Sequence, residues 1–155
     1  MGGSSANVEA VRRFFDATSD YLRGNREPLE TALRELCTPD VFAMPSSALA
    51  SGDAGPFRGR RAVLGQFAGI AQRWTDFEII ADEYVDVPPS TVVLLGKVRA
   101  KRGDGEGYAV EIGIVNRFEQ GRIVSIHSYQ SKRRALEEAG ASSRLAGRAP
   151  PSEDP

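Results

Sequence analysis

Residues 91–130 decide the fold, and they read TVVLLGKVRAKRGDGEGYAVEIGIVNRFEQGRIVSIHSYQ. Glycine-rich residues 103–107 and the pair Gln120-Gly121 divide this stretch into three segments rich in Val and Ile. Segments of this kind bounded by glycine turns are typical of consecutive hairpins. The stretch therefore predicts a three-stranded antiparallel meander with strands at 91–101, 108–118 and 122–130.

Successive side chains of a strand point to opposite faces of the sheet, so the meander has two distinct faces. One face is apolar until its far end and carries Val92, Leu94, Gly96, Val98, Val110, Ile112, Ile114, Asn116, Val124, Ile126, Ser128 and Gln130. The other face mixes apolar and charged residues and carries Val93, Leu95, Lys97, Arg99, Glu111, Val115, Arg117, Ile123, His127 and Tyr129. We expect helices from elsewhere in the chain to cover the apolar face.

Length and composition exclude several classes of protein. The chain has 155 residues, which suits one domain with its own core, and its formal net charge of −1 gives no basic surface for nucleic acid or an anionic membrane. The single cysteine, Cys37, permits neither an internal disulfide nor a thiolate metal cluster. No apolar run approaches the roughly 20 residues of a membrane span, and residues 1–5 lack a signal-peptide pattern. We therefore expect a cytoplasmic protein that binds neither nucleic acid nor membrane.

The rest of the chain predicts helices and one further long strand. Apolar residues at helical spacing predict helices near 8–23, 26–37 and 60–74, the first capped by Asn7, and a short last helix at 131–139. A strand is predicted at 77–85, a short extended segment at 41–44 and a loop at 45–56. Helices segregated from an antiparallel sheet define an α+β domain. We expect this domain at residues 7–140, as a curved antiparallel sheet with three helices packed on its concave face, between disordered ends at 1–6 and 141–155.

Several short motifs resemble those of one known family. They are FRGRRAV at 57–63, WTDF at 74–77, EQGRIV at 119–124, Tyr129, and ALEEAG at 135–140. With them, the chain from about Val8 to Gly140 resembles the SnoaL-like family of the nuclear-transport-factor-two-like superfamily, which includes ketosteroid isomerase, limonene epoxide hydrolase and polyketide cyclases. The resemblance implies a cone-shaped, cystatin-like α+β barrel whose concave pocket takes a small hydrophobic molecule. It also implies a homodimer through the outer face of the sheet.

The catalytic residues of the isomerase and the epoxide hydrolase are replaced in this chain. The isomerase's first-helix tyrosine falls at Phe14, its general-base aspartate near Met44 and its oxyanion-binding acid at Ile114. The hydrolase's arginine and aspartate pair falls near 95–97, and its other aspartate falls at Ser128. The resemblance therefore implies neither ketosteroid isomerase nor limonene-type hydrolase chemistry.

His127 is the only histidine, which makes it a candidate for acid–base catalysis. Strand parity places it with Glu111 and Arg117 on the charged face, where a surface or interface histidine is the simpler interpretation. A β-bulge would reverse this parity. Glu111 is interpreted as the partner of Lys97 or Arg99 across the ladder.

Parity places three polar residues, Asn116, Ser128 and Gln130, on the apolar face. Buried amides and hydroxyls need partners, so either these groups bond to one another or they fix a ligand's carbonyl or hydroxyl in an apolar pocket. Both interpretations stay open. The candidate catalytic residues are Asn116, Ser128, Gln130 and His127. The candidate substrate-binding residues are Phe14, Met44, Gln66, Phe67, Trp74, Leu94, Val98, Ile112, Ile114 and Ile126.

These observations and the resemblance lead us to expect a small biosynthetic enzyme without cofactor or metal. It would cyclise, isomerise or dehydrate a hydrophobic, oxygenated molecule by holding one reactive conformer and polarising an oxygen through neutral donors. The alternative is a non-catalytic ligand-binding or assembly domain that retains the pocket. A homodimer is expected through the apolar residues of the charged face, namely Val93, Leu95, Val115, Ile123 and Tyr129.

Overall fold

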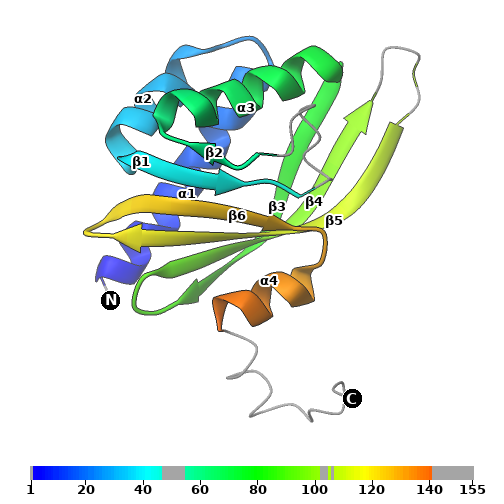
Figure 1. Cartoon of the computed structure of the whole chain (residues 1–155). Helices are drawn as coiled ribbons and strands as arrows, with labels where there is room; N and C mark the ends of the chain where they lie inside the picture. Colours follow the sequence, from blue (N-terminus) through cyan, green and yellow to red (C-terminus); the bar gives the residue numbers. More distant parts are fainter. Residues whose placement is uncertain (1, 47–54, 102–104, 106, 141–155) are drawn as a thin grey trace.

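The computed structural model describes residues 2–46, 55–101, 105 and 107–140, with side chains from residue 6 onward. The elements are α1 (Gly2–Leu22), α2 (Glu27–Leu36), β1 (Cys37–Met44), β2 (Phe57–Arg58), α3 (Arg60–Arg73), β3 (Asp76–Val87), β4 (Thr91–Lys101), β5 (Gly107–Glu119), β6 (Arg122–Tyr129) and α4 (Lys132–Ala139). Helices α1–α3 lie on one side of a curved sheet and α4 lies on the other (Figure 1). The α+β class is therefore confirmed. No helix in these ranges has the length and hydropathy needed to cross a bilayer.

The six strands form one open sheet in the order β2-β1-β6-β5-β4-β3. Strand β3 and the meander of β4, β5 and β6 pair antiparallel, as predicted. The prediction of a wholly antiparallel, barrel-like sheet is wrong, because β1 pairs in parallel with β6 and the edge strands β2 and β3 do not meet. Hairpin turns indicate only how strands adjacent in sequence pair. The pairing of β1 with β6 joins strands that are far apart in sequence, so no turn indicates it.

Paired residues form rows across the concave face of the sheet. Two successive rows are Leu94–Ile114–Ser128 and Val92–Asn116–Ile126. Phe14 of α1 and Phe67 of α3 belong to the same buried cluster, and their rings meet edge to face with centroids 6.4 Å apart. The concave face and the three upstream helices thus enclose the main core.

A β-bulge interrupts the pairing of β5 with β6. Arg117 lies opposite Ser125 and Phe118 lies opposite Ile123, so Val124 is the extra residue. The bulge turns Ile123 into the main core with no exposed surface, although parity predicted it on the outer face.

The N-terminal part of the chain differs from the prediction in two places. Helix α1 begins at Gly2, so Asn7 lies inside a helix and not at its cap. Strand β2 was not predicted; it pairs antiparallel with β1, and the Arg58 guanidinium lies 4.8 Å from the centroid of the Phe42 ring. Most of the predicted loop at 45–56 and all of the predicted tail at 141–155 lie outside the described residues.

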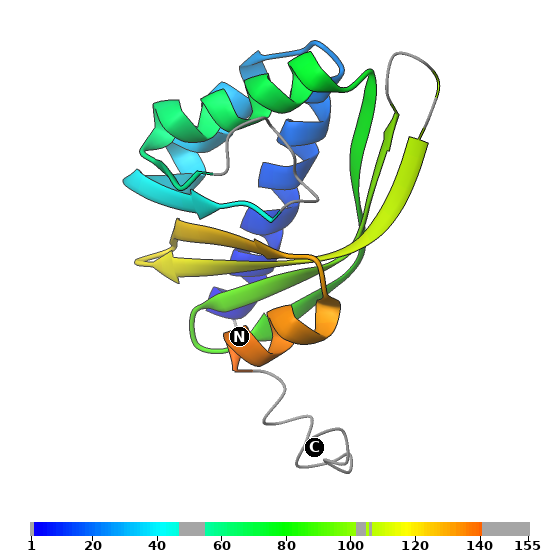
Figure 2. The same ribbon diagram turned by 45° about the vertical axis from the view of Figure 1, so that its right-hand side comes forward.

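Helix α4 packs on the outer face of the sheet, opposite α1–α3, as Figure 2 shows from a second direction. The expectation that the packed helices lie only on the concave face is correct for α1–α3 and wrong for α4, which packs on the opposite face. Ala135 and Ala139 of α4 form a second small core with Val93, Leu95 and Val115. Those three strand residues had suggested a homodimer, but a helix of the same chain covers them. The homodimer stays a prediction, without this apolar surface to motivate it.

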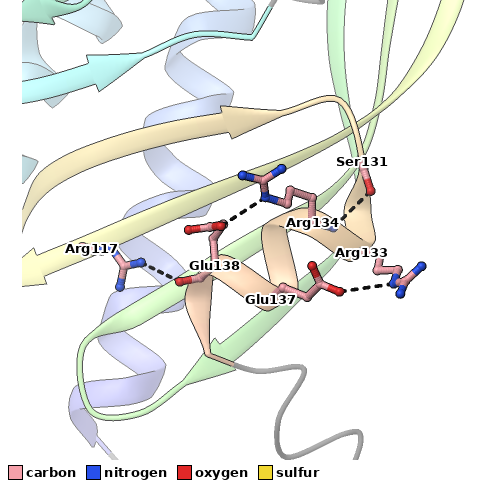
Figure 3. A network of polar contacts seen from close by, with 6 residues as sticks. All are labelled: Arg117, Ser131, Arg133, Arg134, Glu137 and Glu138. Atoms are coloured by element: carbon pink, nitrogen blue, oxygen red, sulfur yellow. Dashed lines mark hydrogen bonds and ion pairs between the residues drawn. The ribbon is translucent and has the colours of Figure 1, made fainter. Parts of the chain in front are cut away.

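Polar contacts at both ends fix α4 on the sheet. At its start, the Ser131 hydroxyl accepts from the Arg134 backbone N–H at 3.0 Å, and Glu111 accepts from the Lys132 backbone N–H at 2.6 Å. The partner of Glu111 is thus α4, and not Lys97 or Arg99 as predicted. At its end, Arg117 donates to the Glu138 carbonyl at 2.9 Å (Figure 3).

Candidate functional site

Asn116 lies on the concave face with none of its surface exposed. Its Nδ2 donates to the backbone carbonyls of Val92 and Ile114, both at 3.2 Å. Its Oδ1 is buried and accepts no hydrogen bond. Because the nitrogen faces two carbonyl oxygens, which only accept, the orientation of the amide is fixed by its surroundings. The unpaired atom of this side chain is therefore an acceptor.

Ser128 and Gln66 add two further buried polar groups, from β6 and from the buried side of α3. Ser128 is 5% exposed and Gln66 is 3% exposed. No hydrogen bond joins either side chain to another residue in the described part of the chain. Thr18 differs, since its hydroxyl donates to the Phe15 carbonyl at 2.8 Å. The mutual network considered for the inward polar groups is therefore not formed among these residues, and Asn116 Oδ1 is the atom of this group that is fully buried without a partner.

Most of the residues predicted to line an apolar pocket lie together in the main core. They are Phe14, Phe67, Leu94, Val98, Ile112, Ile114 and Ile126. Trp74, at the end of α3, packs half-buried against this core, and its ring meets Tyr108 edge to face with centroids 5.3 Å apart. Parity and helical periodicity thus predicted correctly that these side chains share one core, and their role in binding a substrate stays a prediction.

Two predicted site residues, Met44 and Gln130, do not lie on the concave face. Met44 pairs with His127 and alternates with the buried Ala43, so it lies on the outer face and not on the concave one. Gln130 follows the end of β6 and is exposed. The face on which Met44 lies depends on the parallel pairing of β1 with β6. Local sequence patterns do not indicate this pairing, because the two strands are far apart in the sequence.

His127 lies on the outer face, as strand parity indicated, because the bulge precedes it and does not change its direction. Its ring stacks on Tyr129 with centroids 4.8 Å apart. Burial lowers the pKa of His127, and Arg117 and Arg134 lower it further while Glu138 acts in the opposite sense. This histidine is separated by the sheet from the inward polar groups.

Two neighbouring clefts open beside α1, and sequence reasoning found neither. The larger has a volume of about 940 Å³ and lies between the end of α1 and the adjoining ends of β3, β4 and β5. Buried Phe77 and Ala100 and half-buried Tyr108 line it, together with charged residues that include Arg99 and Glu78. Tyr108 lies two residues before Val110 in β5 and therefore on the same face of the sheet. Extending the apolar alternation of β5 by two residues would have included Tyr108 among the concave-face residues.

The smaller cleft, of about 290 Å³, lies between α1 and β3. It shares Ser19 with the larger one and contains Tyr84, whose ring has the Arg12 guanidinium 4.7 Å from its centroid. None of the predicted substrate-binding residues lines either cleft. Roughly 26 Å of strand separates Tyr108 from Asn116, at about 3.3 Å per residue, so one small ligand cannot contact both.

The reactive groups within the described ranges limit the chemistry. No carboxylate is buried there, and no three side chains of His, Cys, Asp or Glu form a group able to hold a metal ion. Cys37 has no exposed surface, and burial raises the pKa of its thiol to about 12. A thiol in this environment is inert as a nucleophile. The inward polar groups are neutral hydrogen-bonding groups.

A curved, open sheet whose concave face is covered by three helices and carries neutral polar groups among apolar side chains defines the α+β architecture of this domain. The chain belongs to the SnoaL-like family, because the model of the SnoaL-like domain matches residues 11–126. No curated protein matches the chain significantly.

Solved structures show the same fold at low sequence identity. Bal32a, from a soil-derived mobile gene cassette, is 23% identical with a TM-score of 0.70, over 88% of this chain and 97% of its own. A putative SnoaL-like polyketide cyclase from Jannaschia sp. CCS1 is 16% identical with a TM-score of 0.66, over 89% and 93%. TerC, co-crystallised with polyporic acid, is 14% identical with a TM-score of 0.65, over 87% and 98%.

Proposed function

We propose that the protein is a small biosynthetic enzyme of cyclase, isomerase or dehydratase type, acting without cofactor on a hydrophobic, oxygenated molecule held at the concave face. The observation that carries this proposal is the buried, unpaired Oδ1 of Asn116 among apolar side chains, together with two further buried polar residues, Ser128 and Gln66. An apolar enclosure with a few convergent polar groups is the usual composition of a small-molecule site. The names of two similar folds, a putative polyketide cyclase and TerC with polyporic acid, agree with this class.

Catalysis in this proposal depends on how the ligand is positioned and on neutral hydrogen-bond donors. No carboxylate is buried in the described ranges and His127 lies across the sheet, so we assign no general acid or base to the site. Ser128 and Gln66 are able to donate to a ligand oxygen, and enclosure by the core restricts the ligand to one conformer. Reactions in which a flexible molecule cyclises or rearranges gain most from such restriction.

Ser128→Ala is expected to weaken ligand binding by about 2- to 12-fold, which corresponds to one hydrogen bond of about 0.5–1.5 kcal/mol. His127→Ala is the matched control and is expected to leave affinity unchanged, since its ring lies on the outer face. Calorimetric titration of both variants with a hydroxylated polyaromatic ligand, chosen by thermal-shift screening, measures the difference. Loss of binding in His127→Ala with normal binding in Ser128→Ala would reject a site at the concave face.

A second candidate function is that of a non-catalytic ligand-binding domain that uses the larger cleft. The specific observation in its favour is the size of that cleft, since about 940 Å³ lies within the ~300–1,000 Å³ typical of ligand pockets. Its lining is mixed, with apolar Phe77 and Ala100 at the core and the Arg99–Glu78 ion pair, at 3.0 Å, beside them.

Ser19→Trp separates the two candidates. Ser19 lies near the end of α1 and lines the larger cleft, so an indole at this position reduces the space in the cleft. Our proposal predicts affinity within about twofold of wild type, because a small ligand at the concave face does not reach this cleft. Equilibrium dialysis with the ligand used above provides the measurement. A loss of affinity of tenfold or more would favour the binding domain.

A further inference from the structure

Asn116 has one hydrogen-bonding atom that the fold leaves without a partner, and this atom is its Oδ1. A buried acceptor without a donor is costly and rare in folded proteins, because it has lost its hydrogen bond to water. The surroundings prevent relief by an amide flip, which would set Oδ1 against the carbonyl oxygens of Val92 and Ile114. The molecule that relieves this cost must therefore bring a donor.

The same geometry excludes the opposite role for Asn116. Both contacts of its Nδ2 are with backbone carbonyls, so the amide has no N–H directed at a ligand. A ligand carbonyl or ether oxygen placed at Oδ1 would put two acceptors together. The earlier expectation that this residue polarises a substrate oxygen as a donor therefore does not fit its hydrogen bonds.

We propose that the concave site selects ligands that carry an O–H or N–H donor on an apolar body, such as hydroxylated or enolic ring systems, and that Asn116 Oδ1 accepts this hydrogen bond. The inference rests on the proposed function, since it needs a ligand at the concave face. It adds the chemical class of that ligand and makes Asn116 a specificity-determining residue.

Ser128 favours a ligand hydroxyl over other donors, because a hydroxyl is also able to accept a hydrogen bond from Ser128. It occupies the row next to Asn116, as the diagonal neighbour on the adjacent strand, and its own hydroxyl makes no hydrogen bond within the described residues. Diagonal neighbours of this kind lie about 7–8 Å apart at Cα and closer at Cβ. A ligand hydroxyl between them is able to donate to Asn116 and accept from Ser128. Side chains cover Oδ1 in this structure, so a ligand binds there by displacing them.

The test compares two probes that differ in one group. β-Naphthol carries a hydroxyl donor, and β-fluoronaphthalene replaces it with fluorine, which cannot donate. Their dissociation constants are measured by calorimetry for the wild-type chain and for Asn116→Leu, which keeps the side-chain size and removes the acceptor. The preference for the naphthol is expected to fall by about 3- to 10-fold in the variant. Comparing preferences within each protein cancels the different hydration of the two probes.

Thr18→Val is the matched control, because Thr18 is also fully buried but already uses its hydroxyl within α1. Its preference is expected to equal that of the wild type. If Asn116→Leu does not fold, Asn116→Val, which suits a strand, takes its place. Binding of both probes with the same preference in wild type and variant overturns this inference and leaves the proposed function standing. Failure of the wild type to bind either probe counts against the proposed function itself.

Discussion

Gly96→Ala is expected to destabilise the protein by about 3 kcal/mol or more, the largest effect of any substitution considered. A Cβ at this position would overlap the backbone carbonyl of Ile80 and lie 3.1 Å from Ala81 Cα. Both neighbours are backbone atoms of β3, immediately before the irregularity in its pairing with β4 between Ala81 and Glu83. The overlap is relieved only by separating β3 from β4, which breaks ladder hydrogen bonds.

Urea denaturation measures this loss as a lower transition midpoint with an unchanged slope. Gly65→Ala is the matched control, since Gly65 lies exposed in α3 with nothing within 4 Å of an added Cβ. Helix propensity predicts that this control is stabilised by up to about 1 kcal/mol. A Gly96→Ala protein as stable as wild type would show that β3 does not approach β4 as described.

The meander and its two faces could be predicted because local chemistry determines them. Glycine turns and apolar alternation are properties of neighbouring residues, and they placed Asn116 and Ser128 on one face correctly. Periodicity likewise gave the buried sides of α1 and α3. The orientation of the Asn116 amide was not predictable, because it depends on the Val92 carbonyl of another strand.

The remaining errors come from contacts between segments far apart in sequence. The parallel pairing of β1 with β6 reversed the face of Met44, and the bulge at Val124 reversed that of Ile123. The sequence does contain one indication of where α4 packs. Gly113 lies in the middle of β5, and a glycine inside a strand indicates that another backbone approaches closely.

That close approach predicts the effect of Gly113→Ala. The added Cβ would overlap Ala135 Cβ and lie 3.3 Å from Lys132 Cα and from the Ser131 carbonyl oxygen. Because the clash is with the start of α4, the helix must move away from the sheet. We expect a loss of about 1–3 kcal/mol in the free energy of unfolding, typical of overpacking. The displaced helix would also uncover Val93, so light scattering is expected to show more self-association than in the wild type.

Ala135→Gly provides the decisive partner for this substitution. Alone, it costs about 1 kcal/mol through helix propensity and lost packing against Gly113. Combined with Gly113→Ala, it removes the methyl that the new Cβ overlaps, so the double variant is expected to be more stable than the sum of the single losses predicts. A favourable coupling of about 0.5–3 kcal/mol from urea unfolding of the four proteins would place Ala135 against Gly113 in solution. Additive losses would instead mean that α4 does not pack on the outer face, and the apolar surface of β4 and β5 would again be available to a second copy of the chain.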